Sequence, residues 1–193
     1  KGDGNVQAFN FRMVLTSDPE NRIIPPKPKN YNREFAKELE FQSVLHPLPN
    51  RKFGWNRPQV IGKQTEYVHG DWTVRKKITD IHLDAAFQKL YYLQNDPEVS
   101  ERDRNFWKEL GLPKDEFVNN KNVPHERYIR EARRIEGQYM CTEHDYLLSP
   151  DYDRAPVHED SIAMTDWYLD SHACTTEKVE GSLHEGKMML FHE

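Results

Sequence analysis

One amphipathic stretch near the middle of the chain constrains the fold more than any other feature of the sequence. Its apolar side chains recur three or four positions apart, at Leu83, Ala86, Phe87, Leu90 and Leu93. That spacing places them on one face of an α-helix, which Thr79 or Asp80 can cap. The helix should run to about Asn95, because Asp96-Pro97 ends it.

A run of alternating apolar residues at positions 6–16 predicts a β-strand. One of its faces carries Phe9, Phe11, Met13 and Leu15, and the other carries Ala8, Asn10, Arg12 and Val14. Residues 46–70 are rich in Pro, Gly, Asn and aromatics, which predicts a long ordered loop. The second half of the chain is expected to be rich in strands, at residues 127–135, 161–174 and 187–192.

Two shorter helices accompany the long one in this interpretation. Asn32 can cap a helix that runs to about Leu45, and a second helix should run from Ser100 to about Leu110. Gly111 then stands where a helix typically places its C-terminal glycine. These elements predict an α+β fold with a mixed or antiparallel sheet and several helices.

The composition fits one folded domain over residues 1–193. Hydrophobic residues make up 36% of the chain, and the mean hydropathy of −0.93 is polar for a globular domain. Four Trp, nine Tyr and nine Phe residues, together with the periodic segments, argue against disorder. A large hydrated surface or a missing partner domain would account for the polarity.

Charge and motif content exclude several classes of protein. The net charge of −5 gives no overall basic field, which argues against nucleic acid as a partner. No apolar run is long enough to span a bilayer, and two cysteines leave the compartment open between cytoplasm and periplasm or exterior. The chain carries no G-x-G-x-x-G turn, no P-loop, no G-x-S-x-G elbow and no C-x-x-C pair.

An arginine-rich segment, residues 128–135, is the first candidate for a site. As a strand, it would place Arg130 and Arg134 on one face and Glu131 and Arg133 on the other. Charges in a sheet are costly unless they are paired or face a ligand, and the guanidinium fork suits carboxylates and phosphates. The segment therefore predicts either anion binding or an internal Arg–Glu network that braces the sheet.

A second candidate site lies at residues 170–174. Asp170, His172 and Cys174 alternate, so they would line one face of a strand. No fourth ligand accompanies them, and we therefore expect no metal site. A His–Asp pair lining a substrate pocket fits these residues better, because histidine titrates near neutral pH.

Four segments of the chain resemble, in the same order, the middle of a family of bacterial FAD-dependent oxidoreductases. The first, residues 6–31, contains the strand, the turn D-P-E-N-R and the stretch P-K-P. The others are E-L-G-L-P-K-D-E-F at 109–117, the arginine-rich segment within 124–145, and D-S-I-A-M with Y-L-D-S-H within 160–172. Some members of the family carry xanthan lyase-like names.

The resemblance implies that the chain is an internal, substrate-side domain of a larger flavoprotein. Flanking parts of the same protein would hold FAD, so this fragment would bind little FAD and be inactive alone. The intact protein would be an oxidoreductase acting on a small molecule. A face left open by the missing FAD-binding domain should expose apolar side chains, with Trp55, Trp72 and the strand ending at Phe191 as candidates.

The resemblance and the residues together suggest the pocket. His172 is the expected catalytic residue, a carrier of protons during hydride transfer. The expected substrate-binding residues are Asn10, Arg12, Arg130, Arg133, Arg134 and Asp170. The alternative is a carbohydrate-binding or polysaccharide-lyase-type module, in which Phe53, Trp55, Tyr67 and Trp72 stack on sugars rather than pack in a core.

Overall fold

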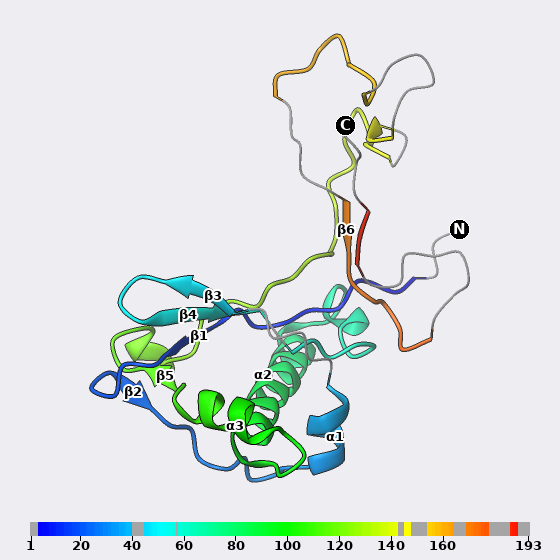
Figure 1. Ribbon diagram of the computed structural model, residues 1–193. Helices are drawn as coiled ribbons and strands as arrows, with labels where there is room; N and C mark the ends of the chain where they lie inside the picture. The colour runs from blue at the N-terminus through cyan, green and yellow to red at the C-terminus, as the bar shows by residue number, and fades with distance from the viewer. Residues whose placement is uncertain are drawn as a thin grey trace.

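The computed structural model describes residues 4–39, 45–56, 58–142, 145–147, 154–163, 169–177 and 186–188. Small antiparallel sheets and a few helices make up the fold, which confirms the expected α+β class (Figure 1). None of the described helices combines the length and the apolar character that crossing a membrane requires.

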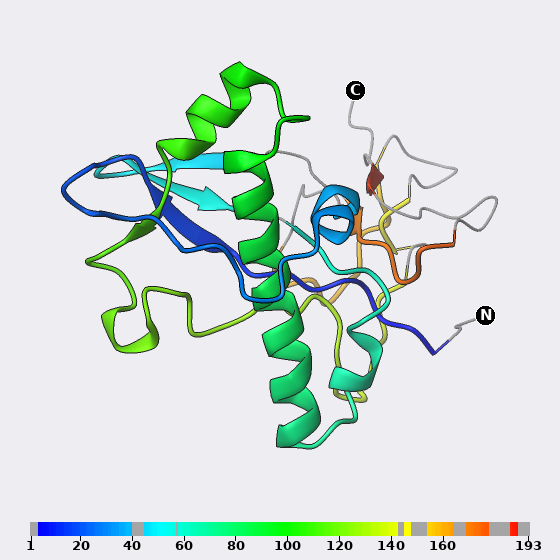
Figure 2. The ribbon, with the colours of Figure 1, turned by 90° about the horizontal axis from the view of Figure 1, so that it is seen from below.

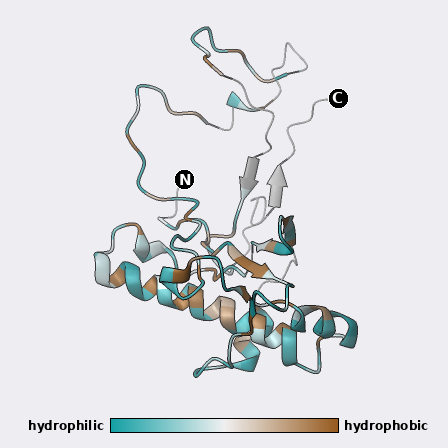
Figure 3. Ribbon diagram, turned by 90° about the vertical axis from the view of Figure 1, so that its left-hand side faces the viewer, coloured by the Kyte–Doolittle hydropathy of each residue, from teal (hydrophilic) through white to brown (hydrophobic). Residues whose placement is uncertain are grey.

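The longest element is helix α2, Trp72–Asn95, which runs the length of the body (Figure 2). It starts earlier than the apolar spacing predicts, because the Asp71 side chain caps it by accepting from Val74 N at 2.9 Å. Its C-terminus at Asn95 confirms the predicted end. Hydrophilic and hydrophobic residues alternate along it (Figure 3), because one side faces the core and the other faces solvent.

Two short helices pack against α2. Helix α1, Arg33–Glu38, is capped by Asn32 as predicted, but it ends well before Leu45, where strand β3 begins. Helix α3, Glu101–Lys108, is capped by Ser100, whose Oγ accepts from Asp103 N at 3.1 Å. The expected start of this helix is thus confirmed.

The principal sheet has three antiparallel strands in the order β1-β4-β3. Strand β1 is Met13–Thr16, β3 is Leu45–Leu48 and β4 is Lys52–Trp55. Trp55 pairs with Met13 on one side and with Leu45 on the other. The expected loop at 46–70 is therefore wrong in its first part, and a single turn of 3-10 helix, η1 (Thr65–Tyr67), lies in the rest.

Two smaller antiparallel sheets complete the described strands. Strand β2, Arg22–Ile23, pairs with β5, Leu112–Pro113, and β6, Leu169–Ser171, pairs with β7, Gly186–Met188. A second turn of 3-10 helix, η2 (Val118–Asn120), follows β5. Of the strand expected over 161–174, β6 is confirmed, residues 161–163 and 172–174 are not in a strand, and residues 164–168 lie outside the described residues. Of the strand expected over 187–192, only the first two residues are described, and they lie in β7.

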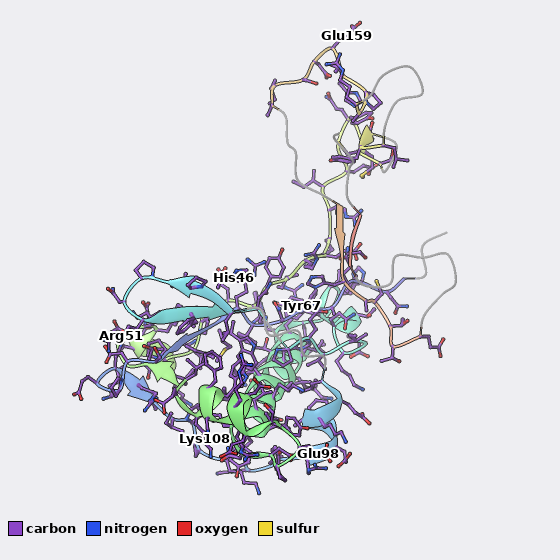
Figure 4. All side chains as sticks on the ribbon, viewed as in Figure 1. His46, Arg51, Tyr67, Glu98, Lys108 and Glu159 are labelled. Carbon is purple, nitrogen blue, oxygen red and sulfur yellow. The ribbon has the colours of Figure 1, made fainter. Side chains whose placement is uncertain are left out.

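The arginine-rich segment is not a strand, and this corrects the prediction for residues 127–135. Tyr128 makes a bridge to Asn10, and residues 129–142 belong to no described strand. The residues beyond, 132–142 and 154–163, form an arm that rises from the body, and Glu159 marks its far end (Figure 4). Exposed arginines keep their hydration in this arrangement, which a sheet interior would deny them.

The core confirms the inward face of the first strand-like run. Phe9, Phe11, Met13 and Leu15 are all buried, three of them in one cluster with residues of α2 and α3. Trp55 is fully buried beside Trp107, with 5.4 Å between ring centroids. The expectation that Trp55 contributes to an exposed patch is therefore wrong, because β4 is the central strand of the sheet.

The other two candidates for that exposed patch are Trp72 and Phe191. Trp72 is 80% exposed at the start of α2, as expected. Phe191 lies outside the described residues. Exposed apolar side chains also occur along the arm, among them Ile135, Val157 and Ile162.

Lys89 is a buried cation that joins two helices. From α2 its Nζ donates to the carbonyl oxygens of Ala36 at 3.0 Å and Lys37 at 3.2 Å, in α1. Burial lowers the pKa of Lys89 to about 8, because desolvation disfavours the ammonium form. The side chain holds α1 against α2 through carbonyl groups rather than through the apolar core.

This lowered pKa predicts how stability changes with pH. Between about pH 8 and 10.4 the unfolded chain binds more protons at Lys89 than the folded chain does, so stability rises with pH. Across that window the wild type should gain about 2 kcal/mol of unfolding free energy relative to Lys89→Met. Urea unfolding at a series of pH values measures this difference. Lys77→Met, on the exposed side of α2, is the control and should follow the wild type. Parallel profiles for wild type and Lys89→Met would contradict the prediction.

Candidate functional site

His172 directly follows β6 and is buried against the N-terminal segment. Its backbone N donates to Gln7 Oε1 at 2.9 Å. Its ring contacts two side chains from distant parts of the chain: Nδ1 lies 2.6 Å from Gln59 Nε2, and Nε2 lies 3.3 Å from a terminal nitrogen of Arg130. The imidazole is therefore fixed at both nitrogens.

The chemistry of these partners defines the tautomer of His172. Arginine has only donors, so Nε2 of the ring must be the acceptor in the Arg130 contact. Nδ1 then carries the proton and needs an acceptor. Gln59 supplies one when its amide presents Oε1, an atom that otherwise has no partner among the described residues. The arrangement holds a neutral imidazole, because a protonated ring has no lone pair left for Arg130.

Arg130 is anchored by the same glutamine that holds the His172 backbone. Its Nε donates to Gln7 Oε1 at 3.1 Å, and the backbone N of Gln7 donates to Glu131 Oε2 at 3.0 Å. The other oxygen of Glu131 accepts from Arg134 at 2.6 Å. Gln7, Arg130, Glu131 and His172 thus form one polar network between the first segment of the chain and the base of the arm.

Tyr128 extends this network to Arg12. The Arg12 guanidinium carbon lies 3.8 Å from the centre of the Tyr128 ring, and that of Arg130 lies 5.8 Å away. The backbone N of Tyr128 donates to Asn10 O at 2.8 Å, and this bridge positions the ring. Asn10 itself is buried, and its Nδ2 donates to Asn56 O at 2.8 Å. Asn10 acts on the site through its backbone.

A pocket of about 440 Å³ opens beside Tyr128. Its lining combines cationic and aromatic side chains: Arg12, Phe117, Pro124, His125, Glu126, Arg127 and Tyr128. A volume of this size suits a small organic molecule.

The remaining predicted site residues are Arg133, Arg134 and Asp170, of which Arg134 meets the network through Glu131. Arg133 and Arg134 are exposed. Asp170 lies in β6, opposite Lys187. The alternation expected from Asp170 through Cys174 ends with the strand at Ser171. Within the described ranges, no three His, Cys, Asp or Glu side chains come together in a way that would hold a metal ion.

Sequence reasoning missed Gln7, Gln59, Tyr128 and Arg127. Gln59 lies in the stretch expected to be a loop, and nothing in its neighbours indicates that it meets a residue 113 positions away. Tyr128 had a usable signal, because it precedes Arg130 at an alternate position of an extended segment.

A second aromatic cluster adjoins the pocket through Arg127. Arg127 donates to the hydroxyl of Tyr67, which lies in the body (Figure 4) and packs edge-on against Phe9 at 5.5 Å. Beneath them, burial lowers the pKa of His82, and the nearby charge of Arg127 acts in the same direction. This cluster is a support of the pocket rather than part of its lining.

The four aromatics considered for sugar stacking do not form a platform. Trp55 and Tyr67 are buried, and Phe53 packs against the main core. Trp72 alone among them is exposed. Packing accounts for the other three.

Comparison with known families places the chain in a class of flavin enzymes. The model of the FAD dependent oxidoreductase family matches residues 1–190, and the chain belongs to this family. No curated protein matches the chain, and no solved structure does.

The described residues do not fit the dinucleotide part of FAD. A pyrophosphate is typically held at a helix N-terminus that follows a glycine-rich turn. Each described α-helix instead carries a carboxylate in its cap or first turn: Glu34 in α1, Asp71 in α2, and Glu101 with Asp103 in α3. These negative charges oppose a diphosphate.

Proposed function

We propose that this chain forms the substrate side of an FAD-dependent oxidoreductase, a wall facing the flavin whose dinucleotide part is held elsewhere in the protein. Family membership supports the reaction class. The carboxylates at the helix N-termini support a binding site for the FAD dinucleotide elsewhere in the protein. The close match of motifs to bacterial members, some named xanthan lyase-like, supports a bacterial source. In such an enzyme the redox chemistry belongs to FAD.

The contact between Arg130 and His172 is the observation that carries the proposal. Oxidation of an alcohol or amine leaves a proton that a base must take, and a neutral imidazole is suited to this. Arg130 occupies the Nε2 lone pair at 3.3 Å, a long contact that a substrate group can replace. His172 would then take the substrate proton at Nε2, while Gln59 holds Nδ1.

Arg130 has a positioning role in this proposal, and it is the arginine we select among the three in its segment. Its Nε is fixed by Gln7, so the guanidinium stays beside His172 when the Nε2 contact opens. Arg133 and Arg134 are exposed, and Arg134 is held by Glu131 rather than by Gln7. Asp170 lies in β6, two positions before His172, and stays a candidate for the same wall.

The test uses the full-length protein with FAD bound. A panel of small alcohols, amines and hydroxy acids is screened anaerobically for donors that bleach the flavin absorbance. His172→Gln should slow reduction by an effective donor about 100-fold and remove one ionisation from the pH profile of that step. Arg130→Met should slow reduction about 10-fold and shift the same ionisation.

Matched controls separate this role from a structural one. Arg133→Met should reduce its flavin at nearly the wild-type rate, because this side chain is exposed. Arg102→Met, on the exposed face of α3, controls for loss of an arginine elsewhere. All variants should retain wild-type flavin content. Unchanged reduction rates and pH profiles in both His172→Gln and Arg130→Met would refute the proposal.

A further inference from the structure

We propose that the pocket between Arg12 and Arg127 binds the carboxylate of a small monoanionic molecule, with an apolar or aromatic body against Phe117 and Tyr128. This inference rests on the proposed function in one respect, that the bound molecule is the substrate. The binding site itself is argued from the pocket alone.

Arg12 is a cation whose hydrogen-bonding edge is available. Within the described part of the chain it makes no hydrogen bond and no ion pair, and its guanidinium stacks on the Tyr128 ring at 3.8 Å. Stacking uses the face of the guanidinium and leaves its N–H groups directed outward from the edge. A planar carboxylate is the group that matches two such N–H donors at once.

Arg127 adds a second positive charge on the same lining. Its terminal nitrogen is used by the Tyr67 hydroxyl, but its Nε is buried and has no partner among the described residues. That nitrogen has no accessible surface and lies out of reach of a bound molecule, so Arg127 contributes its positive charge to the pocket rather than this donor. Glu126 lines the same pocket, so two arginines and one carboxylate leave one net positive charge. That balance favours a monoanion over a dianion such as a phosphate monoester.

The apolar wall of the pocket contains Phe117, which has a strained backbone conformation. Phe117 has a φ of 49°, a left-handed conformation that a bulky residue rarely adopts. Two backbone N–H groups hold its carbonyl, those of Asn120 at 2.8 Å and Asn122 at 3.0 Å. Such strain persists only where the surroundings enforce it, and it concentrates at binding sites. Phe117 lines the pocket together with the two arginines.

The pocket also lies next to the candidate proton carrier. Tyr128 contacts both Arg12, which lines the pocket, and Arg130, which contacts His172. A carboxylate bound at Arg12 would therefore be one aromatic ring away from the Arg130–His172 pair. The substrate class that this arrangement favours is a small carboxylic acid bearing an oxidisable group at a short distance from its carboxylate.

The experiment measures binding rather than turnover, with three probes of similar shape. Benzoate, its neutral analogue benzamide and the dianion phenyl phosphate are titrated into the full-length protein and followed by ligand-observed NMR. We expect benzoate to bind with a Kd on the order of 1 mM, and each of the other two about 10-fold more weakly. Arg12→Met should weaken benzoate about 10-fold, and Arg12→Lys should fall between them, because it keeps the charge and loses the fork.

Arg102→Met serves as the control, since this exposed arginine of α3 does not line the pocket, and it should bind benzoate as the wild type does. Benzamide binding as tightly as benzoate, tighter binding of phenyl phosphate, or wild-type affinity in Arg12→Met would each overturn the inference. So would the absence of any benzoate binding. Because no step depends on flavin reduction, benzoate binding that depends on Arg12 would stand even if His172→Gln leaves the reduction rate unchanged.

Discussion

Trp55→Ala should lower the free energy of unfolding by about 4 kcal/mol. The side chain is fully buried in the central strand of the main sheet and packs on Trp107 at 5.4 Å. Truncation removes a large apolar surface and leaves a cavity that neighbouring strands and α3 cannot fill, because both are fixed by their own pairing and packing.

The same substitution at Trp72 is the matched control. Trp72 is 80% exposed, and its ring lies against Arg75, whose guanidinium carbon is 5.3 Å from the ring centre. Trp72→Ala should therefore change the unfolding free energy by only about 0.5 kcal/mol. Urea unfolding followed by far-UV circular dichroism measures both. Equal losses at the two positions would contradict the burial of Trp55.

A third variant tests the cause of the loss at Trp55. The indole Nε1 is buried and has no hydrogen-bond partner among the described residues. Trp55→Phe removes this unpaired donor along with part of the ring, so it should cost less than half of what Trp55→Ala costs. A loss as large as that of Trp55→Ala would indicate that the indole nitrogen has a partner, such as a bound water.

Local signals predicted the elements that depend on local interactions. The cap at Asn32, the helix start at Ser100 and the helix end at Asn95 are confirmed, because each depends on residues within one turn. The inward face of the first strand-like run is also confirmed, since alternation alone decides which side is buried. The start of α2 was missed because its first two turns are mostly polar, and the cap at Asp71 precedes the apolar pattern.

Strands in the second half failed for the opposite reason, since pairing is decided by segments far apart in the sequence. Tyr128 bridges Asn10, far away in the sequence, and nothing local shows that the segment after Tyr128 belongs to no described strand. Only some residues of the candidate site could be predicted, for the same reason. His172, Arg130 and Arg12 stand out as residue types, whereas Gln7 and Gln59 gain their roles only through contacts 165 and 113 positions away.

Gly111 has a structural role, but it differs from the role at a helix end that the sequence suggests. It follows α3, but Glu109, the residue directly after the helix, keeps a right-handed conformation, and Gly111 itself is not a glycine of positive φ. Instead it exchanges two backbone hydrogen bonds with Thr16, at 2.8 and 3.0 Å, which closes the main sheet against β2 and β5. The absence of a side chain is what permits this approach.

Gly111→Ala should accordingly destabilise the fold by about 3 kcal/mol. A Cβ at this position would lie 2.6 Å from Arg22 Cγ and 2.9 Å from the carbonyl carbon of Ile23, and closer still to the carbonyl oxygen of Ile23. The arginine side chain can move, but the Ile23 backbone is held by pairing with Leu112, so β2 or the Thr16 bridge must give way. Gly54→Ala is the control, because in β4 the nearest atom to its added Cβ is 3.8 Å away, and it should stay within about 0.5 kcal/mol of the wild type. Thermal and urea unfolding of the two variants measure the difference. Equal stability of Gly111→Ala and Gly54→Ala would contradict the close packing of Gly111 on the Ile23 backbone. It would favour the interpretation that this glycine marks the end of a helix.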